Sequence, residues 1–189
     1  MNQRFELRLS GSGGQGVILA SVILAEAAVE SGMNVVQSQS YGPEARGGVC
    51  RAELVLSRDP IWFPKVTRPD FLLALTQASL DKYGRNLADK ATVMLDDSLA
   101  VPDWLEGRRT IAAPILRTAR DTVGKLLTAN IVAVGAINAA LGLFDKDALL
   151  EGVRRRLPAG SEELNRRALA EGATLIGPEL AAAFAQKIG

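Results

Sequence analysis

Two glycine-rich segments contain the residues best suited to bind an anionic ligand. The first reads GSGGQG over residues 11–16, between an alternating strand-like stretch and a run with helical spacing. A glycine turn at this position exposes backbone N–H groups at the positive end of a helix, where an anion is stabilised. Gln15 adds a side chain that can donate and accept hydrogen bonds toward a ligand or a partner chain. The same glycines also fit a tight turn that only packs the helix on the sheet, and both interpretations stay open.

The spacing of Gly11, Gly13 and Gly16 matches the G-x-G-x-x-G fingerprint of dinucleotide-binding folds. Such folds also carry an acidic residue about 20 residues further on, which binds the ribose. Here the second expected strand ends in Gln-Ser-Gln at residues 37–39, with no acid for a ribose hydroxyl and no base for a 2′-phosphate. A stand-alone Rossmann-like nucleotide-binding oxidoreductase therefore remains only as an alternative.

The second segment reads SYGPEARGG over residues 40–48. A Gly-Pro pair favours a turn, and Gly47 with Gly48 permits positive φ angles and close approach of a ligand to the backbone. Glu44 and Arg46 stand between these glycines, where they suit either an anion or a local ion pair. The alternatives are thus a binding loop and a solvated loop.

Composition excludes several kinds of catalytic site. The chain has one cysteine, Cys50, and no histidine. A structural zinc site needs about four Cys or His ligands, and iron–sulfur clusters usually need four thiolates. Serine and cysteine hydrolases normally use an imidazole base. We therefore expect no catalytic residue and no metal site on this chain alone, and a lone thiol suits a reducing compartment.

Charge and hydropathy patterns limit the partners. Lys and Arg number 22 against 21 Asp and Glu, so no general attraction to nucleic acid or anionic lipid is expected. The first ten residues alternate charged and apolar types, unlike a signal peptide. No apolar run reaches the roughly 18 residues of a membrane span. The sequence predicts a soluble cytoplasmic protein that binds neither nucleic acid nor membranes.

The elements that must position these segments alternate along the chain. Period-2 patterns and apolar runs predict strands at residues 4–10, 33–37, 49–57, 71–76, 91–95 and 110–113. Helical spacing predicts helices at residues 17–31, 77–87, 129–143, 146–157, 161–171 and 178–187. This order predicts an α/β fold: a single three-layer domain with a mostly parallel sheet, helices on both faces and a helical C-terminal third. Both glycine segments should lie near the carboxyl edge of the sheet.

Four segments of the chain resemble the gamma subunit of 2-oxoacid:ferredoxin oxidoreductases, most closely the 2-oxoglutarate type. They read GSGGQG, QSYGPEARGG, RPDFLLALTQASLDKYG and TANIVAVGAINAALG. The resemblance covers nearly the whole chain, so we expect one gamma-type domain over residues 1–189. It implies a site near coenzyme A made of the matching residues of the two loops: Gly13, Gly14, Gln15, Gly16, Tyr41, Glu44, Arg46, Gly47 and Gly48.

The resemblance also implies a reaction shared among several chains. A 2-oxoacid, coenzyme A and oxidised ferredoxin would give an acyl-CoA, carbon dioxide and reduced ferredoxin, with thiamine diphosphate as electron sink. Thiamine diphosphate, magnesium and iron–sulfur clusters would belong to partner subunits, and coenzyme A would be a co-substrate. Alpha and beta subunits are expected as partners, a delta subunit is left open, and ferredoxin would be reached through the complex. The 2-oxoacid, the stoichiometry, the choice of ferredoxin or flavodoxin, and a purely architectural role without ligand contact also stay open.

Four further features are interpreted more simply. Asn130, near a helix start, is expected to make local hydrogen bonds. The three arginines at residues 154–156 are expected to form a solvated face. Residues 61–63, Ile-Trp-Phe between two prolines, are either an exposed docking loop or part of the core. Cys50 is expected to be a small buried residue.

Overall fold

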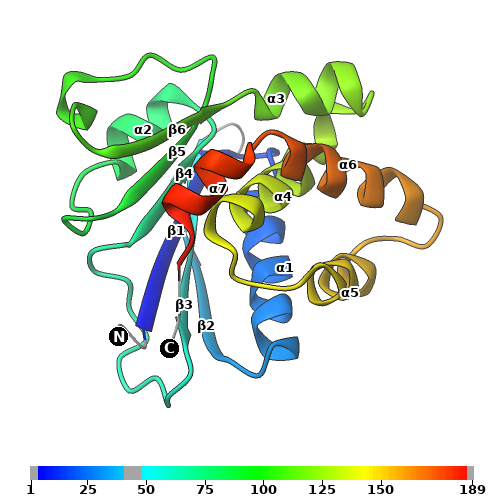
Figure 1. Ribbon diagram of the computed structural model, residues 1–189, viewed down its shortest axis with the longest axis horizontal. Helices are drawn as coiled ribbons and strands as arrows, with labels where there is room; N and C mark the ends of the chain where they lie inside the picture. The colour runs from blue at the N-terminus through cyan, green and yellow to red at the C-terminus, as the bar shows by residue number, and fades with distance from the viewer. Residues whose placement is uncertain (1–3, 41–47, 187–189) are drawn as a thin grey trace.

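A six-stranded sheet lies at the centre of the computed structural model, which describes residues 4–40 and 48–186 (Figure 1). The strands are β1 (Arg4–Ser12), β2 (Asn34–Ser40), β3 (Val49–Ser57), β4 (Phe71–Ala74), β5 (Thr92–Asp96) and β6 (Arg109–Ala113). The helices are α1 (Val17–Glu30), α2 (Gln77–Tyr83), α3 (Ile115–Arg117), α4 (Ala129–Leu141), α5 (Lys146–Arg156), α6 (Glu162–Thr174) and α7 (Pro178–Phe184). Short helical turns are η1 (Asp103–Leu105), η2 (Thr118–Thr122) and η3 (Leu126–Thr128).

The strand order is β2-β3-β1-β4-β5-β6. Strands β1, β4, β5 and β6 pair in parallel, while β3 pairs antiparallel with both β1 and β2. The expected α/β fold with a mostly parallel sheet is confirmed, and β3 is its exception. A parallel crossover needs a dozen or more residues, so the short β2–β3 connection can only make a hairpin.

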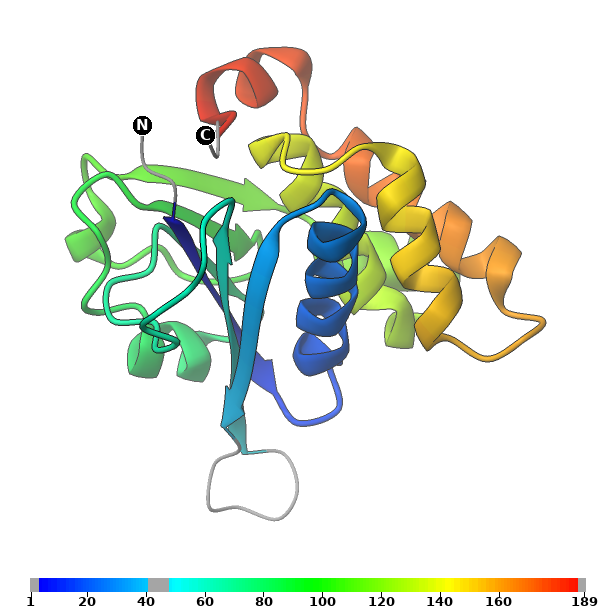
Figure 2. The same ribbon diagram turned by 90° about the horizontal axis from the view of Figure 1, so that it is seen from below.

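Alternation along the strands builds a separate apolar cluster on each face of the sheet. In β4, Phe71 and Leu73 join the larger cluster with α1 and α4, whereas Leu72 and Ala74 join the smaller cluster beside α2. Successive side chains of a strand point to opposite faces of the sheet. A strand that is apolar throughout must therefore be covered by other elements on both faces. Figures 1 and 2 show α1, α4, α5 and α6 gathered on one face and α2 on the other. The three layers are as predicted from the sequence.

Glycines allow the helical layer to pack closely. A Cβ on Gly172 of α6 would lie 2.0 Å from the carbonyl oxygen of Val132 in α4. A Cβ on Gly135 would lie 2.1 Å from the carbonyl oxygen of Leu169, so the two helices approach at backbone distance on both sides of their crossing. Within the part of the chain that the structure describes, no helix combines the length and apolar character needed to cross a membrane.

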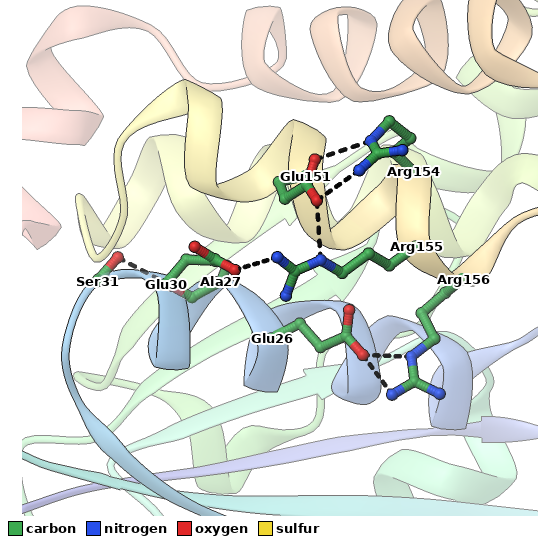
Figure 3. Close-up of polar contacts among 8 residues, drawn as sticks. All are labelled: Glu26, Ala27, Glu30, Ser31, Glu151, Arg154, Arg155 and Arg156. Atoms are coloured by element: carbon green, nitrogen blue, oxygen red, sulfur yellow. Dashed lines mark hydrogen bonds and ion pairs between the residues drawn. The ribbon is translucent and has the colours of Figure 1, made fainter.

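The arginines of α5 form the expected exposed face and also make ion pairs with neighbouring acids. Arg155 pairs with Glu30 and Arg156 with Glu26, both on α1, while Arg154 pairs with Glu151 of its own helix at 2.8 Å (Figure 3). The side chains of Arg154, Arg155 and Arg156 are 68%, 46% and 50% exposed, as expected of a solvated face, and two of them also pair with α1. These pairs form because α5 packs closely on α1, so that the long side chains of Arg155 and Arg156 reach Glu30 and Glu26 of α1.

Candidate functional site

The two glycine segments meet at the carboxyl edge of the sheet. The amide of Gly13 donates a hydrogen bond of 2.9 Å to the carbonyl oxygen of Gly48, and β1 pairs with β3 up to Ser12 opposite Val49. Figure 2 shows the β1–α1 turn, the end of β2 and the start of β3 at one end of the sheet. The expected proximity of the two loops is thus present in their described parts. The other candidate residues of the second loop lie outside the described residues: Tyr41, Glu44, Arg46 and Gly47.

Backbone shape and packing both require glycine in the first loop. Gly14 has φ 98° and Gly16 has φ 71°, the left-handed region that residues with a side chain rarely adopt. A Cβ on Gly16 would also lie 2.8 Å from Nδ2 of Asn130. Gly16 caps α1 without a side-chain hydrogen bond, and no acidic residue stands in the first turn. The amides that begin α1 thus form the positive helix end expected of an anion site.

Gln15 closes the turn with its own side chain. Its Oε1 accepts a hydrogen bond of 2.8 Å from the amide of Ser12, and its Nε2 donates one of 3.5 Å to the carbonyl oxygen of Leu75. The second bond ties the β1 turn to the segment after β4. These contacts make Gln15 a residue that shapes the loop, in addition to any contact it makes with a ligand.

The position of this turn is a topological switch point. After β1 the chain crosses one face of the sheet in α1, and after the neighbouring β4 it crosses the other face in α2. Open α/β sheets bind ligands where adjacent strands send their connections to opposite faces. The Gln15 to Leu75 hydrogen bond spans this place.

The strand order separates this site from a dinucleotide fold. Antiparallel β3 lies between β1 and β2, so the end of β2 is one strand away from the glycine turn. Gln37, in the middle of β2, donates a hydrogen bond of 3.0 Å to Ser21 of α1. The ribose-binding acid of a dinucleotide site stands at the end of the second strand, close to the first, and this arrangement does not supply it.

The described side chains near the turn offer little reactivity. Burial raises the pKa of the Cys50 thiol, which pairs in register with Gly11, and a buried thiol that stays protonated is a poor nucleophile. The carboxylate of Asp96 accepts hydrogen bonds from the amides of Leu116 (2.7 Å) and Ser98 (3.1 Å), so it holds the backbone after β5 and β6. No three His, Cys, Asp or Glu side chains gather as a metal site within residues 4–40 and 48–186. Among the described residues, this edge carries the positive start of α1 and no side chains arranged for acid–base catalysis.

Asn130 occupies a different place from the one expected. Its side chain is 4% exposed and packs on Gly16, which belongs to a turn more than a hundred residues earlier. A polar side chain near a helix start suggests local capping, and only the folded sheet reveals this longer contact. The capping role of Asp96 was also missed, although an aspartate two residues before a serine after a strand is a usable turn signal.

Comparisons with known proteins agree on one family. Residues 6–175 match the family described as pyruvate ferredoxin/flavodoxin oxidoreductase. The 2-oxoglutarate synthase subunit KorC of Methanothermobacter marburgensis is 41% identical over 180 residues, which are 92% of this chain and 97% of that protein. The crystal structure of a keto/oxoacid ferredoxin oxidoreductase gamma subunit from Geobacter sulfurreducens is 43% identical, with a TM-score of 0.81, and the match covers 96% of this chain and 98% of that one.

A more distant structure shares the fold. The 2-oxoglutarate:ferredoxin oxidoreductase of Magnetococcus marinus, solved with 2-oxoglutarate, coenzyme A and succinyl-CoA bound, superposes with a TM-score of 0.85 at 19% identity. The match covers 97% of this chain and 32% of the longer one. At this identity the likeness concerns architecture alone, and it indicates that the same domain also occurs as one part of a longer chain.

Proposed function

This chain belongs to the pyruvate ferredoxin/flavodoxin oxidoreductase family, and we propose that within it the chain is the gamma subunit of a 2-oxoglutarate:ferredoxin oxidoreductase. The observation that carries the proposal is 41% identity to a 2-oxoglutarate synthase subunit over 97% of that subunit's length. The reaction would convert 2-oxoglutarate, coenzyme A and oxidised ferredoxin into succinyl-CoA, carbon dioxide and reduced ferredoxin. The whole chain, residues 1–189, would form one gamma-type domain in the cytoplasm.

The residues of the chain support a division of work among subunits. A cluster held by four thiolates cannot be bound by a chain with one cysteine. Thiamine diphosphate with magnesium, and the iron–sulfur clusters, would therefore lie in alpha and beta subunits and in a delta subunit where one is present. Thiamine diphosphate would supply the electron sink for decarboxylation, and the clusters would pass the electrons to ferredoxin.

For this chain we propose a role at the coenzyme A site. The amides of Gly13 and Gln15 already donate within the turn and to Gly48, so the amides that begin α1, beside the exposed Gly13 and Gly14, would be the ones that stabilise a phosphate of coenzyme A. Gly16 would keep the turn open, and Gln15 would hold its shape. The second loop would complete the site with the groups that the resemblance assigns to it: Tyr41, Glu44, Arg46 and Gly47.

Reconstitution tests the proposed function. The chain is co-expressed with thiamine-binding and cluster-binding subunits of a 2-oxoglutarate oxidoreductase from the same organism, and reduction of ferredoxin is measured with 2-oxoglutarate and coenzyme A. We expect activity from the complete complex, none from the isolated chain and a loss when this chain is omitted. Turnover by the isolated chain, or full activity without it, would contradict the proposal. A higher kcat/KM for pyruvate than for 2-oxoglutarate in the complete complex would reject 2-oxoglutarate as the substrate and leave the gamma-subunit role intact.

A further inference from the structure

The segment between β3 and β4 places aromatic side chains in solvent. Trp62 is 91% exposed and Phe63 is 53% exposed. The sequence left open whether this segment belongs to the core, and the structure answers that it does not. Tryptophan is enriched at the energetic centres of protein interfaces, and a side chain so exposed contributes little to the stability of its own fold.

Hydrogen bonds to β1 hold this segment in place. Arg4 donates to the carbonyl oxygen of Phe63 at 2.6 Å and to that of Lys65 at 2.9 Å, and its guanidinium lies 5.9 Å from the centre of the Phe63 ring. Glu6, which is 8% exposed, accepts from Arg4 at 2.7 Å and from the amide of Thr67 at 2.9 Å. A loop fixed before binding loses less conformational entropy when a partner docks.

The exposed ring borders a hollow large enough for a side chain. This hollow has a volume of about 400 Å³. We call it, with its rim, the Trp62 surface, defined by Arg4, Asp59, Pro60, Ile61, Trp62 and Phe63. A rigid aromatic anchor beside a hollow matches the knob and pocket pairs found at the centres of interfaces.

Charge at the rim distinguishes between possible occupants. Arg58 and Lys65 are exposed cations on this segment, and Asp59 is the exposed anion beside them. Arg4 is half-buried and its charge is paired with Glu6. A two-fold contact between copies of this chain would place the same basic rim against itself, which costs free energy. A partner with acidic residues around an apolar side chain fits the rim better.

We propose that the Trp62 surface docks another subunit of the same oxidoreductase complex, one that presents an apolar side chain flanked by carboxylates. This proposal rests on the proposed function, because that function supplies the complex. Arg4 and Phe63 lie at the amino end of β1, and the glycine turn lies at its carboxyl end. The segment between β3 and β4 is accordingly at the opposite end of the sheet from the β1–α1 turn (Figure 1). Docking there leaves the coenzyme A end accessible.

Affinity of the chain for the rest of the complex tests the proposal. Trp62→Ala is compared with the matched control Val101→Ala, which also removes an exposed apolar side chain, 58% exposed, from a different loop. Because hot-spot tryptophans dominate binding, we expect Trp62→Ala to raise the dissociation constant about 30-fold or more and Val101→Ala to change it less than about threefold. Lys65→Glu should weaken assembly, and more so at low salt than at high salt. Thermal unfolding of each isolated variant should match that of the wild type.

Labelling this chain alone with 5-fluorotryptophan gives a second measurement. The chain has two tryptophans, Trp62 and Trp104, and Trp104 serves as an internal reference. On adding unlabelled partner subunits, the Trp62 fluorine signal should shift and lose its solvent isotope effect. If the wild type assembles and Trp62→Ala assembles equally well, the docking proposal alone fails. If the wild-type chain joins no partner, the proposed function fails and the docking proposal with it. Self-association of the wild type that Trp62→Ala abolishes would also overturn the proposal, in favour of a second copy.

Discussion

Gly14 and Gly16 both have positive φ angles, and their surroundings differ. A Cβ on Gly14 would meet nothing within 4 Å, whereas one on Gly16 would collide with the Asn130 amide. Gly14 is therefore required only by the backbone conformation of the turn. Gly16 is also required by packing, because it lets the start of α1 lie close to the start of α4. A ligand that approaches the turn would do so from the side of Gly13 and Gly14, which is the exposed side.

Arg46 gives the sharpest prediction for a single residue. It is the basic residue between Gly42 and Gly48 in a segment outside the described residues, and coenzyme A is anionic. A charge-assisted hydrogen bond contributes roughly 1.5–3 kcal/mol, so Arg46→Ala should raise the KM for coenzyme A about 10- to 150-fold. The KM for 2-oxoglutarate and the assembly of the complex should stay nearly unchanged.

Two control variants test whether a raised KM for coenzyme A in Arg46→Ala reflects direct binding of coenzyme A by Arg46. Arg120→Ala removes an exposed arginine that pairs with the adjacent Asp121, and it should leave the KM for coenzyme A unchanged. Glu44→Gln tests whether Arg46 acts through a local ion pair. An intact complex in which Arg46→Ala has a wild-type coenzyme A dependence would refute the assignment.

At the scale of elements, the crossing of α4 and α6 is the most sensitive contact. The atom that a Gly172 side chain would meet is the backbone oxygen of Val132, 2.0 Å away, which moves only with its helix. Overpacking of this kind costs about 1–3 kcal/mol or more, so Gly172→Ala should lower the urea midpoint clearly. Gly177→Ala is the matched control, because its Cβ would meet nothing within 4 Å, and a shift under about 0.5 kcal/mol is expected. Equal midpoints for the two variants would contradict the close crossing.

The ion pairs of α5 predict a pH dependence. Hydrogen bonds from Arg154 and then Arg155 lower the pKa of Glu151 to about 2 (Figure 3). A carboxyl whose pKa is lower in the folded state stabilises the fold above its unfolded pKa, and that contribution is lost as pH falls through the folded pKa. Glu151→Gln should therefore be less stable than the wild type at pH 7, by a small amount because the pair is exposed. The difference should shrink between pH 4.5 and pH 2.

Urea unfolding at several pH values measures this effect. Glu106→Gln is the control, since Glu106 is exposed and forms no ion pair with any other described residue. Its stability relative to the wild type should show no comparable change over the same range. A difference for Glu151→Gln that stays constant down to pH 2 would show that these arginines do not stabilise the carboxylate.

Most strands and long helices could be predicted from local patterns, and their ends show where such patterns fail. The strand expected at residues 49–57 has those bounds in the structure. The helix expected to reach residue 87 ends at Tyr83 with Gly84 as its C-cap, and Asn86 beyond it has φ 62°, which does not continue a right-handed helix. The helical turns at residues 115–128 were not predicted. One of them is held by the distant carboxylate of Asp96, which no local pattern contains.

The candidate site could be predicted in outline only. Alternating strands and helices imply that connecting loops gather at one edge, and the first glycine segment does lie there, with Ser40 and Gly48 as the described ends of the second. The bond between Gly13 and Gly48 and the contact between Gly16 and Asn130 join residues far apart in the chain. Such pairs follow from the strand order, in particular from β3 lying beside β1, and hydrophobic periodicity does not determine that order.

At the scale of the whole molecule, the strand order argues against nucleotide cofactors. Because β3 separates β1 from β2 and β2 contains no acidic residue from Asn34 to Ser40, a ribose next to the glycine turn would find no carboxylate from the second strand. We expect no NAD or NADP binding tighter than about 1 mM in calorimetric titration of the isolated chain, a limit that corresponds to about 4 kcal/mol. Coenzyme A titrated into the complete complex is the positive control, and micromolar affinity for either dinucleotide would revive the alternative.

The central place of β1 also affects how the chain is made. Strand β1 pairs on one side with β3 and on the other with β4, so neither of its edges pairs with β2, the next strand in the sequence. About 60 residues must follow Ser12 before β4 is complete, which takes roughly 3–12 s at 5–20 residues per second. During those seconds of translation Leu7 and Leu9, both fully buried in the finished fold, lack the β4 side of their final environment. We therefore expect the β4 side of β1 to stay unpaired until β4 has been synthesised.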